Sequence, residues 1–255
     1  CRQQPRGYAG DAALIDFLYG ERPAREETQR MDDFARRLNA TTTAMPAGGA
    51  VCQRRDRTAD LIDAVAASTP GTHVLSVACG HCRELSVSQA AQQGDVERFV
   101  ALDQDDESLD VVQRDYGHLG VETVSESVTH LLRNPRKYGT FDLIYAGGLY
   151  DYLSDVFARR LTDSLLTALR PGGRLLIGNF APGLVETGFM EAFMDWFLIY
   201  RTTAQVQAIA DGLTGDVADC EIVADDDGQV VYLMLTKVVE SAPASAGLAA
   251  TASVA

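Results

Sequence analysis

One stretch of the chain constrains its fold and function more than any other: an apolar run, a glycine turn and, after a second apolar run, an acid. The run Val74–Val77 reads as a buried strand, and Gly80 lies in the turn that follows it. The second run ends on Asp103, 23 residues after Gly80. In nucleotide-binding α/β sheets an acid about 20 residues past the turn glycine bonds the ribose hydroxyls. Glycine suits the turn because the backbone then approaches the ligand without a Cβ. The spacing therefore predicts an adenosine cofactor.

From His73 onward the apolar pattern alternates between strands and helices, which is typical of parallel strands joined by crossover helices. The last two predicted strands flank the turn sequence Asp225–Gly228, which indicates an antiparallel hairpin. We therefore expect an α/β fold with a Rossmann-like, doubly wound, seven-stranded sheet, mostly parallel, and an antiparallel C-terminal hairpin strand. The predicted strands are 73–78, 98–103, 121–125, 141–146, 173–179, 220–224 and 230–238, and the predicted helices are 83–93, 106–116, 154–169 and 186–213, the last broken near Tyr200.

The chain before the sheet reads as helical. Leu14, Ile15 and Leu18 recur at helical spacing before Gly20, and a charged segment at 24–39 carries an apolar stripe. Small residues over 41–49 predict a loop ahead of a third helix at 50–67. We expect residues 1–69 to form a helical lid and residues 70–239 to form the cofactor-binding domain. The Ala/Ser-rich residues 240–255 are expected to be disordered.

Composition narrows the class of partner. The formal net charge is −14, which argues against nucleic acid because binding there depends on Lys and Arg neutralising phosphates. A small-molecule substrate is favoured instead.

The five cysteines are scattered and odd in number, unlike a disulfide framework, which predicts reduced thiols and a cytoplasmic location. The sequence has no run of about 18 apolar residues, so we expect no membrane span. The chain begins at Cys1 rather than Met, so we interpret it as a fragment; any upstream domain and the oligomeric state cannot be read from it.

The strand and turn motifs resemble those of the class I S-adenosylmethionine-dependent methyltransferases, over about residues 58–239. Val74–Glu84 resembles the first motif of that family. Ser76 stands in place of its usual acid, Ala78 in place of the first glycine and Cys82 in place of the third. Asp103 matches the ribose-binding acid. The resemblance implies S-adenosylmethionine as the cofactor.

Two further segments extend this resemblance. Phe141–Ala146 resembles the fourth-strand motif, and Leu169–Leu175, with its Pro-Gly-Gly turn, resembles the turn before strand five. A narrower similarity concerns Arg6–Asp11, Ala78–Glu84 and Gly148–Leu153. These segments resemble a bacterial subgroup that includes synthases of hydroxy-fatty-acid methyl ester signals.

The family pattern implies a set of cofactor-binding residues. Because Ser76 lacks the carboxylate that commonly holds the methionine amino group, we expect Glu84 or Asp11 to take this role. Ser127 follows strand three, where it either meets the adenine or only caps a helix. Tyr8 and Asp11 belong to a Gly-rich segment that either closes over the cofactor or begins a helix. The predicted cofactor-binding residues are Tyr8, Asp11, Ala78, Gly80, Glu84, Asp103, Gln104 and Ser127.

Candidates for the reacting end of the site follow strands four and five, since such sheets bind ligands at the carboxyl ends of their strands. Tyr150 is the first choice, because an aromatic face stabilises a sulfonium cation. Asn179 either orients a substrate oxygen or makes a turn. Arg201 either pairs with a substrate carboxylate or forms a surface salt bridge. We predict Tyr150, Asn179 and Tyr200 as catalytic residues and Tyr152 and Arg201 as substrate-binding residues.

The pair Cys79 and Cys82, with His81 between them, resembles half of a metal site. A structural zinc needs four ligands, and no second Cys/His pair of suitable spacing follows. We therefore predict no metal and interpret the pair as small-residue packing in the loop.

These patterns predict methyl transfer from S-adenosylmethionine to a small-molecule acceptor, a carboxylate or a hydroxyl. The sequence presents no His-Asp or metal set, which favours a pre-ionised acceptor that needs no base. Two alternatives stay open: an enzyme that cyclises the aminobutyryl arm of the same cofactor and releases methylthioadenosine, or a non-catalytic binding domain. A dehydrogenase is disfavoured, because the third glycine is absent and the strand-five turn matches methyltransferases better.

Overall fold

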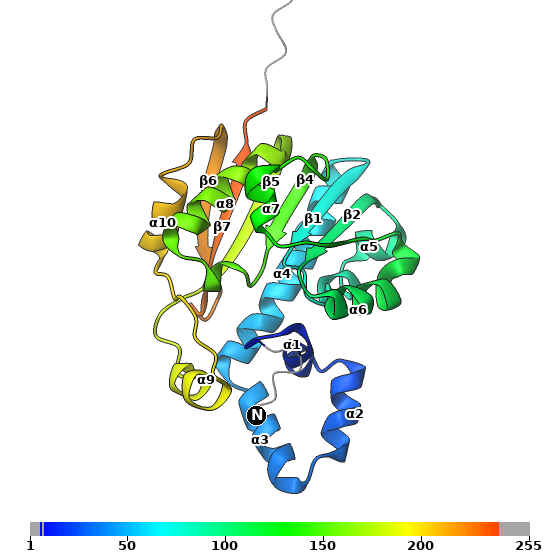
Figure 1. Cartoon of the computed structure of the whole chain (residues 1–255), viewed down its shortest axis with the longest axis vertical. Helices are drawn as coiled ribbons and strands as arrows, with labels where there is room; N and C mark the ends of the chain where they lie inside the picture. Colours follow the sequence, from blue (N-terminus) through cyan, green and yellow to red (C-terminus); the bar gives the residue numbers. More distant parts are fainter. Residues whose placement is uncertain (1–5, 7, 240–255) are drawn as a thin grey trace, which may run out of the picture.

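A seven-stranded sheet organises the protein, whose computed structural model describes residue 6 and residues 8–239 (Figure 1). The strand order is β3-β2-β1-β4-β5-β7-β6. Strand β7 is antiparallel to β5 and β6, and the other neighbouring pairs are parallel. The predicted fold class is therefore confirmed. The strands are β1 (Thr72–Val77), β2 (Val96–Asp103), β3 (Glu122–Ser125), β4 (Phe141–Ala146), β5 (Leu169–Phe180), β6 (Val217–Ala224) and β7 (Val230–Lys237).

Helices cover both faces of the sheet, which explains why its central strands are buried and largely apolar. All six residues of β4 are buried. On one face, side chains such as Leu75, Ile144 and Leu175 pack against α7 (Thr129–Arg133), α8 (Asp155–Ala168) and α10 (Thr203–Ala210). On the other face, Val74 and Leu143 pack against α4 (Pro46–Ser68), α5 (Gln89–Gln93) and α6 (Asp106–Tyr116).

The strand order reverses direction between β1 and β4, which creates the crevice where open α/β sheets bind ligands. Three helices lie beyond this end of the sheet, α1 (Ala12–Tyr19), α2 (Arg22–Arg30) and α3 (Asp33–Thr43), and the long α4 joins them to β1 (Figure 1). Helix α9 (Thr187–Met194) lies beside them. The N-terminal helices are therefore placed to contact whatever binds at the crevice.

The structure corrects several predicted boundaries in the N-terminal region. The segment 24–39 is not one helix: α2 ends at Arg30, and the Asp32 side chain caps α3 by accepting from the Ala35 amide at 2.7 Å. The loop predicted at 41–49 is wrong, because α3 continues to Thr43 and α4 begins at Pro46. The Thr41 hydroxyl donates to the Arg37 carbonyl within α3 at 2.9 Å, so these threonines satisfy their hydroxyls without leaving the helix.

Smaller differences concern the later segments. The helix predicted at 83–93 is a short 3₁₀ turn at Arg83–Ser86 followed by α5. The helix predicted at 186–213 is divided into α9 and α10, and the break predicted near Tyr200 lies in the irregular segment between them. Further 3₁₀ turns occupy Gly117–Leu119 and Tyr150–Tyr152. The predicted tail at 240–255 lies outside the described residues.

Candidate active site

The turn after β1 keeps a glycine-like backbone although two of its glycines are replaced. Ala78, Gly80 and Cys82 have φ angles of 53°, 52° and 49°. This left-handed region disfavours any residue with a Cβ. The three positions are those of the three family glycines, so the loop conformation has been retained at Ala78 and Cys82 at a cost in strain.

Asp103 ends β2 beside this turn. Its carboxylate accepts the Gly80 amide at 2.8 Å and the Asp105 amide at 3.0 Å. The side chain is largely buried, and burial raises the pKa of Asp103 above its ordinary value, although the amide hydrogen bonds oppose that shift. Asp103 is thus fixed at the strand end with the remaining lone pairs of its oxygens available to a diol.

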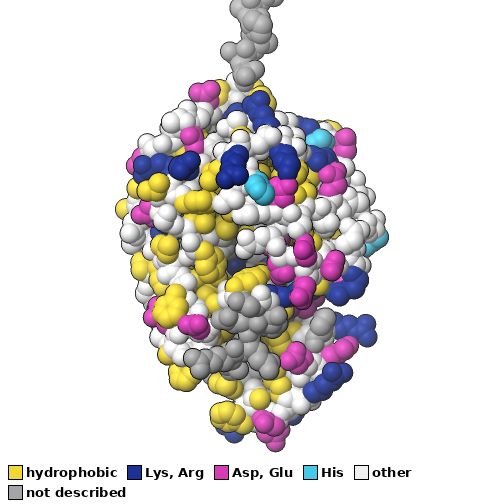
Figure 2. Space-filling view, viewed as in Figure 1, with side chains coloured by type: hydrophobic (Ala, Val, Ile, Leu, Met, Phe, Trp, Pro, Cys, Tyr) yellow, Lys and Arg dark blue, Asp and Glu magenta, His cyan; other side chains and the backbone are white. Residues whose placement is uncertain are grey.

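A cavity of about 730 Å³ opens at this edge of the sheet. It is bounded by the carboxyl ends of β1, β2 and β4 and by α1 and α4. We call it the main cavity. Figure 2 shows a hollow in the molecular surface near the centre of the face that it draws. Of the predicted site residues, the cavity brings together Tyr8, Ala78, Gly80, Glu84, Asp103, Gln104 and Tyr152.

Glu84 and Tyr145 form the polar part of the wall near β1 and β4. The Tyr145 hydroxyl donates to the Glu84 carboxylate, and Ser76 also lines the cavity there. Burial raises the pKa of Glu84 despite this hydrogen bond. Glu84 and Ser76 thus lie in the same part of the cavity wall, so the position that lacks the family acid has a carboxylate in its surroundings.

Arg54 of α4 also lines the main cavity and was not among the predicted site residues. Its Nη1 atom is buried without a hydrogen-bond partner among the described residues and lies 3.9 Å from the Asp151 carboxylate. The guanidinium lies over the Phe180 ring, 5.7 Å from the ring centroid. A half-buried cation with an unpaired N–H group is a ready partner for a carboxylate. The predicted helix at 50–67 carries Arg54, Arg55 and Arg57, and this cluster of arginines was the only sequence signal for the role of Arg54.

Asp151 is buried between Arg54 and the end of β5. Its Oδ1 accepts the Phe180 amide at 2.7 Å. Burial raises the pKa of Asp151 to about 7, while Arg54 and the Phe180 amide favour the charged form. Asp151 therefore changes charge close to neutral pH beside Arg54.

A buried network ties α1 to the turn after β1. Asp16 of α1 accepts from the Arg83 guanidinium at 2.6 and 2.8 Å, and His81 Nδ1 lies 2.9 Å from the same carboxylate. These bonds hold the pKa of Asp16 below its ordinary value although burial opposes this. His81 is thus engaged in holding the N-terminal helix against the turn.

The two predicted residues of the Gly-rich segment before α1, Tyr8 and Asp11, have different positions in the structure. The Tyr8 hydroxyl reaches Asp105 at 3.4 Å on the rim of the main cavity. Asp11 caps α1 instead: its side chain accepts the Leu14 amide at 2.8 Å and the Arg6 amide at 3.1 Å. Asp11 lies outside the cavity lining, whereas Glu84 belongs to it.

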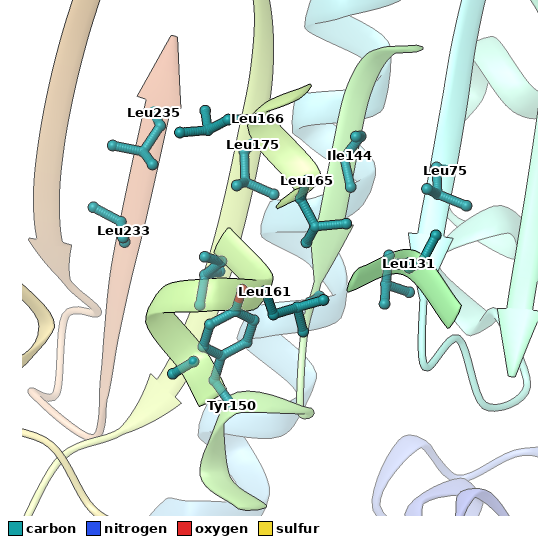
Figure 3. Close-up of a cluster of buried hydrophobic side chains, with 14 of the residues drawn as sticks. Leu75, Leu131, Ile144, Tyr150, Leu161, Leu165, Leu166, Leu175, Leu233 and Leu235 are labelled. Carbon is teal, nitrogen blue, oxygen red and sulfur yellow. The ribbon is translucent and has the colours of Figure 1, made fainter. Parts of the chain in front are cut away.

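The structure does not bring Tyr150 to the site. Its ring is fully buried among core leucines, with Leu161 and Leu165 nearby, and its hydroxyl lies 2.9 Å from that of Thr162 (Figure 3). The 3₁₀ turn after β4 directs this side chain into the core under α8. The predicted catalytic role is corrected to a structural one.

Arg201 and Asn179 are likewise internal. Arg201 is fully buried and donates to Asn179 Oδ1 at 2.6 Å, to the Tyr150 carbonyl at 2.7 Å and to Asp155. Asn179 donates to the carbonyls of Phe180 and Ile199, both at 2.9 Å. These bonds fasten the segment after α9 to the ends of β4 and β5, so neither residue takes its predicted role toward substrate.

Three predicted residues remain. Tyr200 is half-buried and packs against the core outside the main cavity. Ser127 also lies outside the lining, although Glu126 and Val128 on either side of it belong to it, and its hydroxyl accepts from Thr129 at the start of α7. Tyr152 stays a candidate, because it lines the cavity and accepts the Trp196 indole N–H at 2.7 Å.

Across the described part of the chain, no cluster of three His, Cys, Asp or Glu side chains could hold a metal ion. Within residues 6 and 8–239, none of the helices combines the length and apolar character that a membrane crossing requires.

Comparison with known proteins agrees with this geometry. Residues 74–173 match a family described as a methyltransferase domain. A search of curated proteins found no match to the chain. The domain match and the fold together confirm the predicted enzyme class, a class I methyltransferase, and its predicted cofactor, S-adenosylmethionine.

Solved structures share the fold at low identity. A protein of Bordetella parapertussis, described as a possible exported protein, is 20% identical with a TM-score of 0.73, covering 92% of this chain and 81% of that one. Magnesium protoporphyrin IX methyltransferase of Synechocystis PCC 6803 is 14% identical with a TM-score of 0.54, over 75% and 87% of the two chains. An N-methyltransferase of Bradyrhizobium japonicum WM9 is 15% identical with a TM-score of 0.52, over 83% and 97%.

Proposed function

We propose that this enzyme transfers the methyl group of S-adenosylmethionine to a carboxylate of a small-molecule acceptor. The observation that carries the proposal is Arg54 in the wall of the main cavity, a half-buried cation whose buried Nη1 has no hydrogen-bond partner among the described residues. The narrower resemblance to hydroxy-fatty-acid methyl ester synthases agrees with it, because such an ester is the product of methyl transfer to a carboxylate.

The residues of the main cavity fit the cofactor. Asp103, at the end of β2, is placed to accept from the ribose hydroxyls, and Glu84 to accept from the methionine amino group. When bound, S-adenosylmethionine supplies a methyl group on a sulfonium centre that is already a good leaving group. The protein therefore has to align the acceptor and exclude water rather than generate a nucleophile.

Arg54 performs the alignment in this proposal. Its guanidinium pairs with the acceptor carboxylate and leaves one carboxylate oxygen directed at the methyl group. The new O–CH₃ bond forms as the S–CH₃ bond breaks, giving a methyl ester and S-adenosylhomocysteine. No proton is transferred, so the chemistry needs no general base. His81, which is held by Asp16, then has no part in the reaction.

The N-terminal helices act as a cover in the same proposal. Ala12, Ile15 and Tyr19 of α1 line the main cavity, and Tyr8 and Arg6 reach the acids that follow β2. The cover excludes water from the reacting groups.

We place the activity in the cytoplasm, since the described cysteines Cys52, Cys79, Cys82 and Cys220 are free thiols.

Product analysis tests the reaction. The protein is incubated with S-adenosylmethionine and a panel of aliphatic and aromatic carboxylic acids, and the nucleoside products are identified by mass spectrometry. S-adenosylhomocysteine together with a methyl ester supports the proposal. Methylthioadenosine would show cyclisation instead, and an unchanged cofactor that still binds would indicate a binding domain.

Replacing Arg54 with Gln separates its role toward the acceptor from a role toward the cofactor. We expect KM for the acid to rise by roughly tenfold or more, the scale of one charge-assisted hydrogen bond, with little change in the Kd for S-adenosylmethionine. Arg57→Gln on the same helix is a matched control, because Arg57 lies outside the main cavity, over the Tyr232 ring. A rise in the cofactor Kd alone would assign Arg54 to the cofactor carboxylate.

A further inference from the structure

A second cavity lies among the N-terminal helices, apart from the main cavity. Its volume of about 410 Å³ falls within the range of small-molecule sites. Helices α1, α3 and α9 and the first turns of α4 supply most of its lining, and Figure 1 shows these helices together beyond the sheet. Of the described residues, none lines both cavities. The second cavity is therefore a separate space that methyl transfer in the main cavity does not use.

The lining of the second cavity combines aromatic rings with flexible side chains. Four of the five methionines in the chain belong to it. Methionine side chains adapt their shape to a ligand, and aromatic faces attract cations. The aromatic residues of the lining are Phe17, Phe34, Phe180, Phe189 and Trp196. Such a lining suits an apolar body that carries a positive charge.

A buried carboxylate interrupts this apolar lining. Glu186, the residue before α9, is only 4% exposed. One of its oxygens accepts the amide of Ala47, at the start of α4, at 3.4 Å. The other oxygen is buried and has no hydrogen-bond partner among the described residues. The amino end of α4 attracts negative charge and accounts for the first oxygen. The second oxygen is costly to bury unless a donor reaches it from the cavity.

The charges around the second cavity are all of one sign. Glu27 of α2 adds a second carboxylate at its exposed edge. Among the described residues that line the cavity there is no Lys, Arg or His. Opposite charges attract strongly where water is partly excluded, and like charges repel. The lining therefore favours an organic cation and disfavours a carboxylic acid.

We propose that the second cavity binds an amphipathic primary amine, whose ammonium group donates a hydrogen bond to the buried oxygen of Glu186. The apolar body of the amine lies among the aromatic rings and methionines of the lining. A primary amine fits better than a quaternary one, because Glu186 needs an N–H donor as well as a positive charge. This inference does not depend on the identity of the methyl acceptor.

The fluorescence of Trp196 provides a direct readout, because this is the one tryptophan in the sequence and it lines the second cavity. The probes are octylamine, octyltrimethylammonium and octan-1-ol, titrated with saturating S-adenosylmethionine present so that the cofactor part of the main cavity is filled. We expect octylamine to bind saturably and about tenfold more tightly than octan-1-ol, the scale of one charge-assisted hydrogen bond. Octyltrimethylammonium, which keeps the charge but has no N–H, should bind between the two.

Three variants locate the binding. Glu186→Gln keeps the side-chain size and removes the charge, so it should weaken octylamine binding by roughly tenfold and change octan-1-ol binding by less than about twofold. Glu191→Gln on α9 is the matched control, because it removes the same charge outside both cavity linings and should leave both affinities within about twofold. Leu38→Phe narrows the cavity and should weaken both probes by roughly tenfold. Calorimetry with S-adenosylmethionine, with a Kd within about twofold of the parent, shows that each variant is folded.

Three results would overturn the proposal. No saturable Trp196 response to octylamine removes the site. Equal binding of octylamine and octan-1-ol, or tighter binding of octyltrimethylammonium than of octylamine, removes the primary amine as its ligand. Octylamine binding that is unchanged in Glu186→Gln or in Leu38→Phe places the amine elsewhere on the protein.

Discussion

Replacing Ala78 with glycine should stabilise the fold, because this residue has a left-handed backbone. Its φ angle is 53°, and an L-residue in this region costs roughly 1–2 kcal/mol relative to glycine. Glycine also raises the conformational entropy of the unfolded chain, which lowers the free energy of unfolding by about 0.4–1 kcal/mol. The difference predicts a gain of roughly 0.5–1 kcal/mol in the free energy of unfolding for Ala78→Gly.

Gly80→Ala is the matched control within the same turn. Its φ is 52°, and an added Cβ would lie 3.2 Å from the Ala12 Cβ, so the variant incurs both backbone strain and crowding against α1. We expect it to lose roughly 1–2 kcal/mol. Urea unfolding followed by far-UV circular dichroism measures both changes. Equal destabilisation by the two variants would contradict the left-handed conformation at Ala78.

Three further predictions concern the site and its surroundings. Asp103→Ala should weaken S-adenosylmethionine binding by about 1.5–3 kcal/mol in calorimetry, and an unchanged Kd would remove the ribose assignment. Because the pKa of Asp151 is raised to about 7 in the folded chain, the protein binds a proton there that the unfolded chain releases near pH 4. Stability should fall as pH rises from about 4 to 7, by at most about 1.4 kcal/mol per unit, and Asp151→Asn should flatten this slope in urea unfolding across that range. Tyr150→Phe should lower stability by about 1 kcal/mol through loss of the bond to Thr162 while kcat stays unchanged, and a tenfold fall in kcat at unchanged stability would restore a catalytic role.

The sheet was predictable because its strands are buried on both faces. Residues of β4 are apolar almost without interruption, and few alternatives accommodate such a run. The antiparallel hairpin followed from the turn sequence between β6 and β7. Helix ends in the N-terminal region were harder, because Thr41 and its neighbours favour loops by composition but satisfy their hydroxyls within α3.

The site was predictable where spacing along the chain fixes geometry, and not elsewhere. Gly80 lies in the turn after β1 and Asp103 ends the neighbouring parallel strand β2, so their meeting at one edge follows from the topology. Tyr150 follows β4 just as closely, but a 3₁₀ turn rotates it into the core while Tyr152, two residues later, faces the cavity. Position after a strand predicts proximity to the site, whereas the direction of the side chain depends on the local turn.

Arg54 shows most clearly what the sequence could not supply. Its partners come from two separate parts of the chain: the segment that follows β4, with Gly148 and Asp151, and Phe180 at the end of β5. A Cβ at Gly148 would lie 3.3 Å from the Arg54 guanidinium, so this glycine leaves room for the side chain. Arg54 is a half-buried arginine that lies over an aromatic ring, and the acid beside it titrates near pH 7. Because that acid neutralises its charge only in part, the guanidinium keeps affinity for a second carboxylate. That property belongs to the assembled site, and under the proposed function it makes the charge state of Asp151 a determinant of acceptor binding.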